Sequence, residues 1–130
     1  MFLLHCPYCG EHRDEEEFSN AGEAYIARPA EPEAVDDATW GDYVFMRRNP
    51  KGWFWEQWQH TAACRKVFAV KRNTATYEIA GSWTLAEGKA LFEADMALAR
   101  ARDNHHGTAP DALARPSSTA KPAQPQEARQ

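Results

Sequence analysis

Three cysteines and one histidine stand in two short pairs whose residue types and spacing suit a metal ion. Cys6 and Cys9 are separated by two residues, and His60 and Cys64, separated by three, follow some 50 residues later. Thiolates and imidazoles are the ligands that zinc prefers in structural sites. Four such ligands fill a tetrahedral site and leave no position for the water that a hydrolytic zinc requires. The sequence therefore predicts one structural zinc ion held by Cys6, Cys9, His60 and Cys64.

Other interpretations of the same residues remain open. Cys-Pro-Tyr-Cys is also the dithiol of glutaredoxin-like oxidoreductases, in which the first thiolate lies at a helix N-terminus. That fold needs a full strand before the motif and an amphipathic helix after it, which residues 1–5 and the polar residues 10–17 do not predict. Three unconnected buried thiols would leave the paired spacing unexplained. His5 and His12 are alternatives to His60, although His5 should point away from a metal that its neighbour binds.

These residues must be positioned by strands and loops, and the sequence predicts a small α+β protein. It is expected to be a zinc-ribbon-like antiparallel β domain with a C-terminal helix and a disordered tail. Apolar runs and alternation predict strands at residues 2–5, 17–26, 43–48, 53–59, 67–70 and 76–79, and a helix at 85–102 despite Gly88. The segment 17–26 is expected to return beside the first strand, with a bend at Gly22. Asn-Pro-Lys-Gly at residues 49–52 predicts a turn that joins 43–48 to 53–59 as a hairpin.

The strand predicted at residues 53–59 leads directly to the second ligand pair and carries three tryptophans. Trp53 and Trp55 are expected on one face of the strand and Trp58 on the other, because side chains alternate along a strand. One face would pack on the domain and the other would meet a partner. The alternative is that all three tryptophans lie in the core.

Length and composition predict one folded domain at residues 1–102 and a disordered Ala/Pro-rich tail at residues 103–130. The tail contains four prolines, no aromatic residue and a single large aliphatic residue, Leu113. It therefore cannot bury enough apolar surface to offset its chain entropy. All fifteen aromatic residues belong to the first segment, which predicts several large buried or interfacial side chains.

The cysteine count and the hydropathy pattern indicate a cytoplasmic protein. An odd number of cysteines argues against a disulfide framework, and a reducing compartment suits thiolates held by a metal. The sequence shows no signal segment at its start and no run of 18 apolar residues, so we expect neither export nor a membrane span.

Charge is unevenly placed along the chain. Residues 11–42 contain eleven acidic residues and two arginines, whereas residues 47–72 contain seven basic residues and one glutamate, Glu56. Such asymmetry favours docking to complementary protein surfaces. The basic stretch is also rich in aromatic residues, which is typical of nucleic-acid surfaces. A net charge of −4 and the acidic stretch would repel phosphate, so nucleic acid is the less favoured partner, and a simple solvated surface remains an alternative.

Together these segments resemble the delta subunit family of heterotetrameric sarcosine oxidase. The resemblance rests on FLLHCPYCG at residues 2–10, EEF at 16–18, GEA at 22–24, YVFMR at 43–47, NPKG at 49–52, WQH at 58–60, CRK at 64–66 and RNT at 72–74. It covers roughly residues 1–84, which is more specific than a single Cys-x-x-Cys motif. By this resemblance, the family's zinc ligands match Cys6, Cys9, His60 and Cys64.

The resemblance also implies partners and a reaction. In that family the beta subunit carries FAD and covalent FMN and oxidises sarcosine, and the alpha subunit is associated with NAD and tetrahydrofolate. Glycine, hydrogen peroxide and formaldehyde or methylenetetrahydrofolate are the products. The chain itself has no Gly-x-Gly-x-x-Gly motif for a dinucleotide, so we expect a non-catalytic subunit that works with the alpha, beta and gamma subunits. Related enzymes act on other N-methylated amines, and a stand-alone zinc-ribbon module that binds protein or nucleic acid is the alternative.

One residue departs from the pattern of the family. The residue before the last ligand, commonly glycine there, is Ala63 here. A left-handed backbone at this position would be mildly strained, since only glycine adopts it freely. We expect the metal to be retained.

Overall fold

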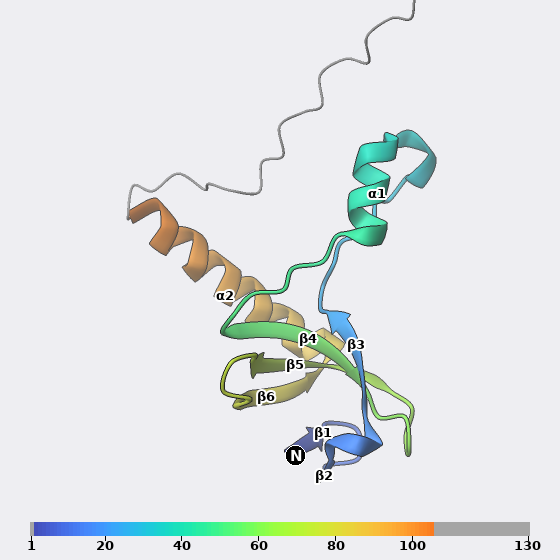
Figure 1. Ribbon diagram of the computed structural model, residues 1–130, viewed down its shortest axis with the longest axis vertical. Coiled ribbons are helices and arrows are strands. Elements are labelled where there is room, and N and C mark those ends of the chain that lie inside the picture. Colours follow the sequence, from blue (N-terminus) through green and yellow to red (C-terminus); the bar gives the residue numbers. More distant parts are fainter. Residues whose placement is uncertain (1, 106–130) are drawn as a thin grey trace, which may run out of the picture. The chain divides into compact units, whose positions relative to one another are not determined.

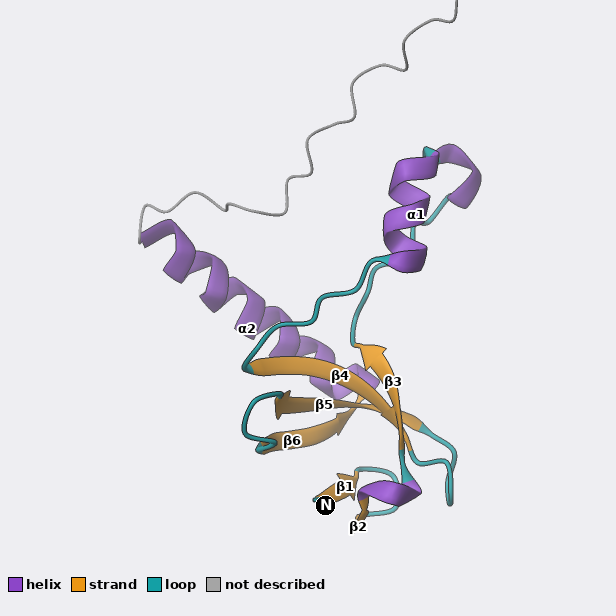
Figure 2. Ribbon diagram, viewed as in Figure 1, coloured by secondary structure: helices purple, strands orange, loops and turns teal. Residues whose placement is uncertain are grey.

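The computed structural model describes residues 2–105, which form six strands, two α-helices and two short 3-10 helices (Figures 1 and 2). The elements are β1 (Leu3–Cys6), β2 (Glu11–Asp14), η1 (Glu15–Glu17), β3 (Ser19–Glu23), η2 (Pro32–Ala34), α1 (Asp37–Phe45), β4 (Trp53–Gln59), β5 (Val67–Asn73), β6 (Ile79–Thr84) and α2 (Leu85–His105). They confirm a small α+β protein with antiparallel sheets and a C-terminal helix.

The chain divides into a unit at Met1–Met96, to which the following description applies, and a unit at Ala97–Gln130 that includes the last turns of α2. The predicted C-terminal helix is confirmed and continues to His105. The rest of the predicted tail, residues 106–130, lies outside the described residues, so the division at residue 102 stays a prediction. No helix within residues 2–105 combines the length and the apolar content that a membrane span requires.

A two-stranded sheet carries the first cysteine pair. β1 and β2 are antiparallel, with Cys6 opposite Glu11, and the four residues between them form a tight turn. Gly10 closes this turn with a left-handed φ of 72°, and its backbone N–H donates to the Cys6 carbonyl at 2.8 Å. The strand β2 was not predicted, because its charged residues lie on the surface and show no apolar alternation.

The other four strands form one antiparallel sheet in the order β3-β4-β5-β6. The prediction that residues 17–26 pair with the first strand is wrong, since β3 pairs with β4 instead. The predicted bend is present: the register shifts between Asn20 and Gly22, whose φ is 89°. β5 extends to Asn73 and β6 begins at Ile79, so the turn between them lies later in the chain than predicted.

The prediction of a strand at residues 43–48 is wrong, and with it the prediction of a hairpin to residues 53–59. Residues Asp37–Phe45 form α1, and the N-cap Asp36 accepts the Thr39 N–H at 2.9 Å. The aromatic and β-branched residues at 43–45 favour strand structure by propensity, but this cap and the residues before them allow a helix. Residues 46–50 have no regular structure, and β4 pairs with β3 and β5.

The core of the first unit consists of two clusters on opposite faces of the four-stranded sheet. The first contains Leu4, Cys6, Phe18, Trp58, Phe68 and Val70, and the second contains Ala24, Trp55 and Ala69 with Tyr25, Trp83, Leu85 and Phe92 against them. Trp55 and Trp58 therefore occupy opposite faces, as predicted. Both are buried, so the expectation that one of these faces is free for a partner is wrong at these positions. Trp53 is 49% exposed, so the three tryptophans do not all lie in the core. The first cluster packs β1 against the sheet and thereby fixes the first cysteine pair.

The helix α2 packs its first turns against the second cluster. A Cβ added at Gly88 would lie 2.5 Å from the Tyr25 hydroxyl, so a glycine is required for this close approach. Trp55 Nε1 donates to Asp95 Oδ2 at 2.9 Å, and Lys71 donates to the same oxygen. Burial opposes ionisation of Asp95, but these two hydrogen bonds and the Lys71 charge lower its pKa. The glycine that argues against a helix in the sequence therefore allows the helix to pack.

Candidate metal centre

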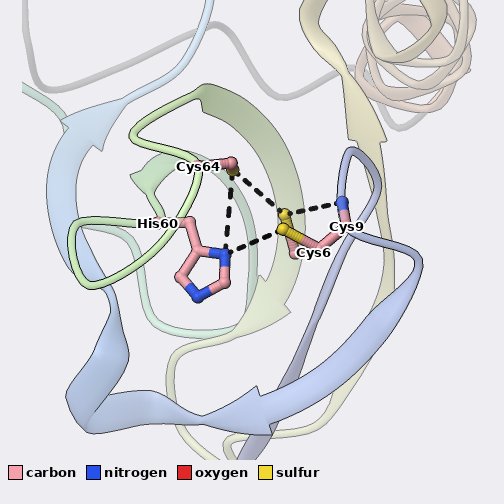
Figure 3. A group of neighbouring side chains, drawn as sticks. All are labelled: Cys6, Cys9, His60 and Cys64. Carbon is pink, nitrogen blue, oxygen red and sulfur yellow. Dashed lines mark hydrogen bonds between the residues drawn. The ribbon is translucent and has the colours of Figure 1, made fainter.

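The structure brings together all four residues that were predicted as metal ligands (Figure 3). Cys6 ends β1, Cys9 lies in the turn that follows, and His60 and Cys64 belong to the loop between β4 and β5. One ligand atom from each side chain lies within 4.8 Å of the others. All three cysteines are free thiols. The cluster therefore offers three sulfur ligands and one nitrogen ligand to a single ion.

Three of the six separations between these atoms match a tetrahedral zinc site, and all six lie within 4.8 Å. The Cys6 and Cys64 sulfurs are 3.7 Å apart, and His60 Nδ1 lies 3.5 Å from the Cys9 sulfur and 3.8 Å from the Cys64 sulfur. Ordinary zinc bond lengths in a tetrahedron place two sulfurs about 3.8 Å apart and a sulfur and a nitrogen about 3.6 Å apart. The residues present can hold zinc without a large movement of the backbone.

The two loops that hold these ligands have similar backbone features. In the first, the Cys9 N–H donates to the Cys6 sulfur at 3.5 Å and Gly10 has a left-handed φ. In the second, the Arg65 N–H donates to the His60 carbonyl at 2.8 Å, and Arg65 has a φ of 57°. The left-handed residue therefore directly follows the second ligand in both loops.

The expectation of backbone strain at Ala63 is wrong. Among the described non-glycine residues, positive φ is found at Tyr25, Arg65 and Tyr77. The second ligand loop therefore places its left-handed residue after Cys64, at Arg65, and an alanine before that ligand is accommodated without strain.

A carboxylate that the sequence did not single out orients the histidine. His60 is 1% exposed, its Nδ1 faces the sulfurs, and its Nε2 lies 3.1 Å from Glu17 Oε2. When Nδ1 binds a metal, Nε2 carries the proton and donates to Glu17, which fixes the tautomer and raises the basicity of the ligand. The Phe18 ring stacks on the imidazole with centroids 4.3 Å apart. The acidic run at residues 14–17 gave no sign of which carboxylate would have this role.

The backbone of Glu17 also connects its segment to the second ligand loop. Its carbonyl accepts the Ala62 N–H at 3.1 Å and the Thr61 hydroxyl at 3.0 Å. The carboxylate and the loop that carries His60 are therefore held in one hydrogen-bonded unit.

The alternative ligands His5 and His12 do not belong to the cluster. Their rings lie against each other with centroids 5.0 Å apart, and His5 Nδ1 lies 3.0 Å from the Ser82 hydroxyl. The glutaredoxin-like alternative is also disfavoured, because Cys6 ends a strand and is followed by a turn and β2. In a glutaredoxin-like protein the first thiol of the dithiol lies at a helix N-terminus, which lowers its pKa.

The metal-free thiols have divergent acidities. Desolvation raises the pKa of Cys64, but hydrogen bonds from the Lys66 backbone and from Cys6, Cys9 and His60 outweigh it and lower the pKa to about 7. Desolvation, together with the hydrogen bonds and charges of Cys6 and Cys64, raises the pKa of Cys9 to about 11. Once one cysteine of the cluster is ionised, ionisation of a second is therefore unfavourable in the absence of a cation. A bound divalent ion would favour the thiolate forms instead.

Comparison with known proteins gives matches over most of the described chain. A family model described as "Sarcosine oxidase, delta subunit family" matches residues 3–85, which include all four cluster residues. The sarcosine oxidase subunit delta of Corynebacterium sp. (strain P-1) is 46% identical over 87 residues, which are 67% of this chain and 88% of the relative. The sarcosine oxidase subunit delta of Arthrobacter sp is 45% identical over 87 residues, again 67% of this chain and 88% of the relative. That of Rhizobium meliloti (strain 1021) is 42% identical over 92 residues, 71% of this chain and 95% of the relative.

Proposed function

The chain belongs to the sarcosine oxidase delta subunit family, and from this premise we propose that it is the zinc-binding accessory subunit of a sarcosine oxidase complex. The observation that carries the proposal is the set of four candidate ligand atoms within 4.8 Å, three of whose separations suit tetrahedral zinc. Cys6, Cys9, His60 and Cys64 would fill all four positions. Since no position remains for water or substrate, the zinc would stabilise the fold and take no part in catalysis.

The position of the cluster supports a structural role for zinc. Its ligands come from the β1–β2 hairpin and from the loop between β4 and β5, which belong to different sheets. A single ion would cross-link two segments that are far apart in the sequence. Structural zinc contributes an apparent ~10 to 16 kcal/mol of binding free energy that is coupled to folding. For a small domain with a thin core, this contribution is decisive.

We place the oxidation chemistry on the partner subunits. FAD and covalent FMN would reside on the beta subunit, and NAD and tetrahydrofolate would associate with the alpha subunit. Sarcosine, or a related N-methylated amine, would be converted there to glycine, formaldehyde or methylenetetrahydrofolate, and hydrogen peroxide. The strands of residues 2–105 are all antiparallel, whereas a dinucleotide-binding unit needs parallel strands with a crossover helix, which supports this division. Such a heterotetramer of alpha, beta, gamma and this chain would work in the reducing cytoplasm.

Native mass spectrometry of the full chain, purified gently with its natural partners, tests the proposal. The expected spectrum contains one zinc ion on this chain within an assembly whose other subunits carry flavin. A zinc-loaded monomer without flavoprotein partners, even at low salt, would favour a stand-alone zinc-ribbon module. A chain without metal in a flavin-containing assembly would contradict the zinc assignment alone.

Replacing Glu17 with alanine should lower the zinc affinity of the subunit by about 10- to 100-fold, the usual effect of losing a carboxylate that orients a histidine ligand. The reason is the hydrogen bond from His60 Nε2, which fixes the imidazole with Nδ1 toward the sulfurs. Competition with a chromophoric chelator measures the affinity. Glu16→Ala is the matched control, because Glu16 is exposed and adjacent. Equal affinities for the two variants would show that Glu17 does not support the ligand.

A further inference from the structure

Residues 25–54, which we call the arm, comprise the connection between β3 and β4, with η2 and α1, and the first two residues of β4 (Figure 1). The buried residues on either side are Ala24 and Trp55, and the structure describes every residue between them. None of these residues is buried, including those of α1. Tyr25 at its start packs against the second cluster, but the arm contributes no fully buried side chain to either cluster.

The arm nevertheless carries large apolar side chains on its surface. Val44, Phe45 and Met46 are consecutive and are 39%, 79% and 46% exposed. Trp40 and Tyr43 contact each other, with ring centroids 5.3 Å apart, and the Arg28 guanidinium lies 6.0 Å from the Trp40 ring. These contacts are local and leave Phe45 uncovered. A run of exposed apolar residues at the end of a helix is a feature of binding surfaces.

Hydrogen bonds hold the C-terminal part of the arm in place. Arg47 donates to the Tyr43 and Met46 carbonyls, and Arg48 binds Glu23 of β3 through its backbone N–H and its side chain. The Thr74 hydroxyl donates to the Pro50 carbonyl at 2.8 Å. The backbone around Phe45 is thus organised before binding, which reduces the entropy lost when a partner binds.

The charges around the apolar residues indicate the chemistry of the partner. The arm up to Met46 contains five carboxylates and a single basic residue, Arg28, which lies over Trp40, and three basic residues follow, of which Arg48 pairs with Glu23 and Arg47 donates to backbone carbonyls. The carboxylates are Glu31, Glu33, Asp36, Asp37 and Asp42. Within residues 2–105, none of the five takes part in an ion pair. A complementary surface would be an apolar recess with basic residues at its rim.

We infer that the arm docks this chain onto another subunit of the oxidase, with Phe45 inserted into an apolar recess that has a basic rim. This inference rests on the proposed function, because it takes its partner from the oxidase complex. It assigns the contact to one segment that is distinct from the metal cluster. Zinc would stabilise the sheet and the ligand loops, and the arm would provide affinity for the partner.

The test is co-expression of the full chain with the alpha, beta and gamma subunits, followed by native mass spectrometry over a dilution series. Phe45→Glu should raise the concentration at which half of the assemblies lose this chain by at least about tenfold. The isolated variant should keep its zinc and its melting temperature, because Phe45 is largely exposed. Leu91→Glu is the matched control, an exposed apolar residue on α2 that receives the same charge, and it should dissociate like the unchanged chain.

A second measurement does not depend on any variant. Hydrogen exchange of the unchanged assembly should show protection of residues 37–54 relative to the free chain. The inference would be overturned if Phe45→Glu dissociated at the same concentration as the unchanged chain, or if protection were confined to other segments. The proposed function would still stand in either case, provided that the unchanged chain assembles. Failure of the unchanged chain to join the flavin-carrying subunits would overturn both. Self-association of the free chain that Phe45→Glu abolishes would assign the surface to a second copy instead.

Discussion

Cys64→Ser should bind far less zinc than the unchanged chain and should melt at a temperature lower by on the order of 10 °C or more. A serine hydroxyl is a poor zinc ligand, so the substitution leaves two thiolates and one imidazole for an ion that prefers four ligands. Because zinc binding is coupled to folding, part of its ~10 to 16 kcal/mol is lost from stability, and about 1 kcal/mol corresponds to 4–8 °C in a domain of this size. Elemental analysis for zinc and thermal melting of the full chain measure the two effects.

The matched control is Ala63→Ser, which places the same side chain one position earlier in the same loop. Ala63 is exposed and is not a member of the cluster. The Ala63→Ser variant should therefore keep the zinc content and the melting temperature of the unchanged chain. A chelator should lower the melting temperature of the control and have little effect on Cys64→Ser. Full zinc occupancy and normal melting of Cys64→Ser would contradict the assignment of four ligands.

The sequence was sufficient to predict that Cys6, Cys9, His60 and Cys64 meet, because each of the two pairs is local. Cys6 and Cys9 share one turn, and His60 and Cys64 share one loop, so short spacing alone indicates that each pair can approach a common point. The meeting of the two pairs requires only that β1 and the loop after β4 come together, which the buried Leu4 and Cys6 bring about by packing with Trp58 and Phe68. Glu17 could not be predicted in the same way, because its contact with His60 spans 43 positions.

The errors in the predicted fold have physical causes at particular residues. The aromatic and β-branched residues 43–45 favour a strand, but the Asp36 cap starts a helix before them, and such capping is a weak signal in an acidic stretch. The short charged strand β2 has no apolar face to reveal it. The pairing of β3 with β4 is a long-range choice, and apolar periodicity specifies which face of a strand is buried but not which strand lies beside it.

Replacing Glu56 with alanine should lower the free energy of unfolding by about 3–5 kcal/mol, the typical cost of removing one partner from a buried ion pair. Glu56 is 5% exposed on β4, and its carboxylate accepts two hydrogen bonds from Arg72, at 2.8 and 2.7 Å. Trp58 Nε1 also donates to it, at 3.0 Å. Without the carboxylate, the Arg72 guanidinium and the buried indole N–H lose their acceptor, and the pKa of Arg72, which Glu56 raises, would fall.

Two controls separate this effect from the loss of any surface charge. Glu11→Ala removes the exposed carboxylate that pairs with Arg13 and should cost no more than about 1 kcal/mol. The double variant Glu56→Leu with Arg72→Met removes both charges and should recover most of the loss, because apolar residues of similar size often replace a buried ion pair at little cost. Urea unfolding of the zinc-loaded full chain gives all three values. Equal stability of Glu56→Ala and Glu11→Ala would contradict the prediction, because it would mean that water enters and solvates Arg72. It would also mean that the packing of Trp58 with Cys6 in the first cluster does not depend on the hydrogen bond from Trp58 to Glu56.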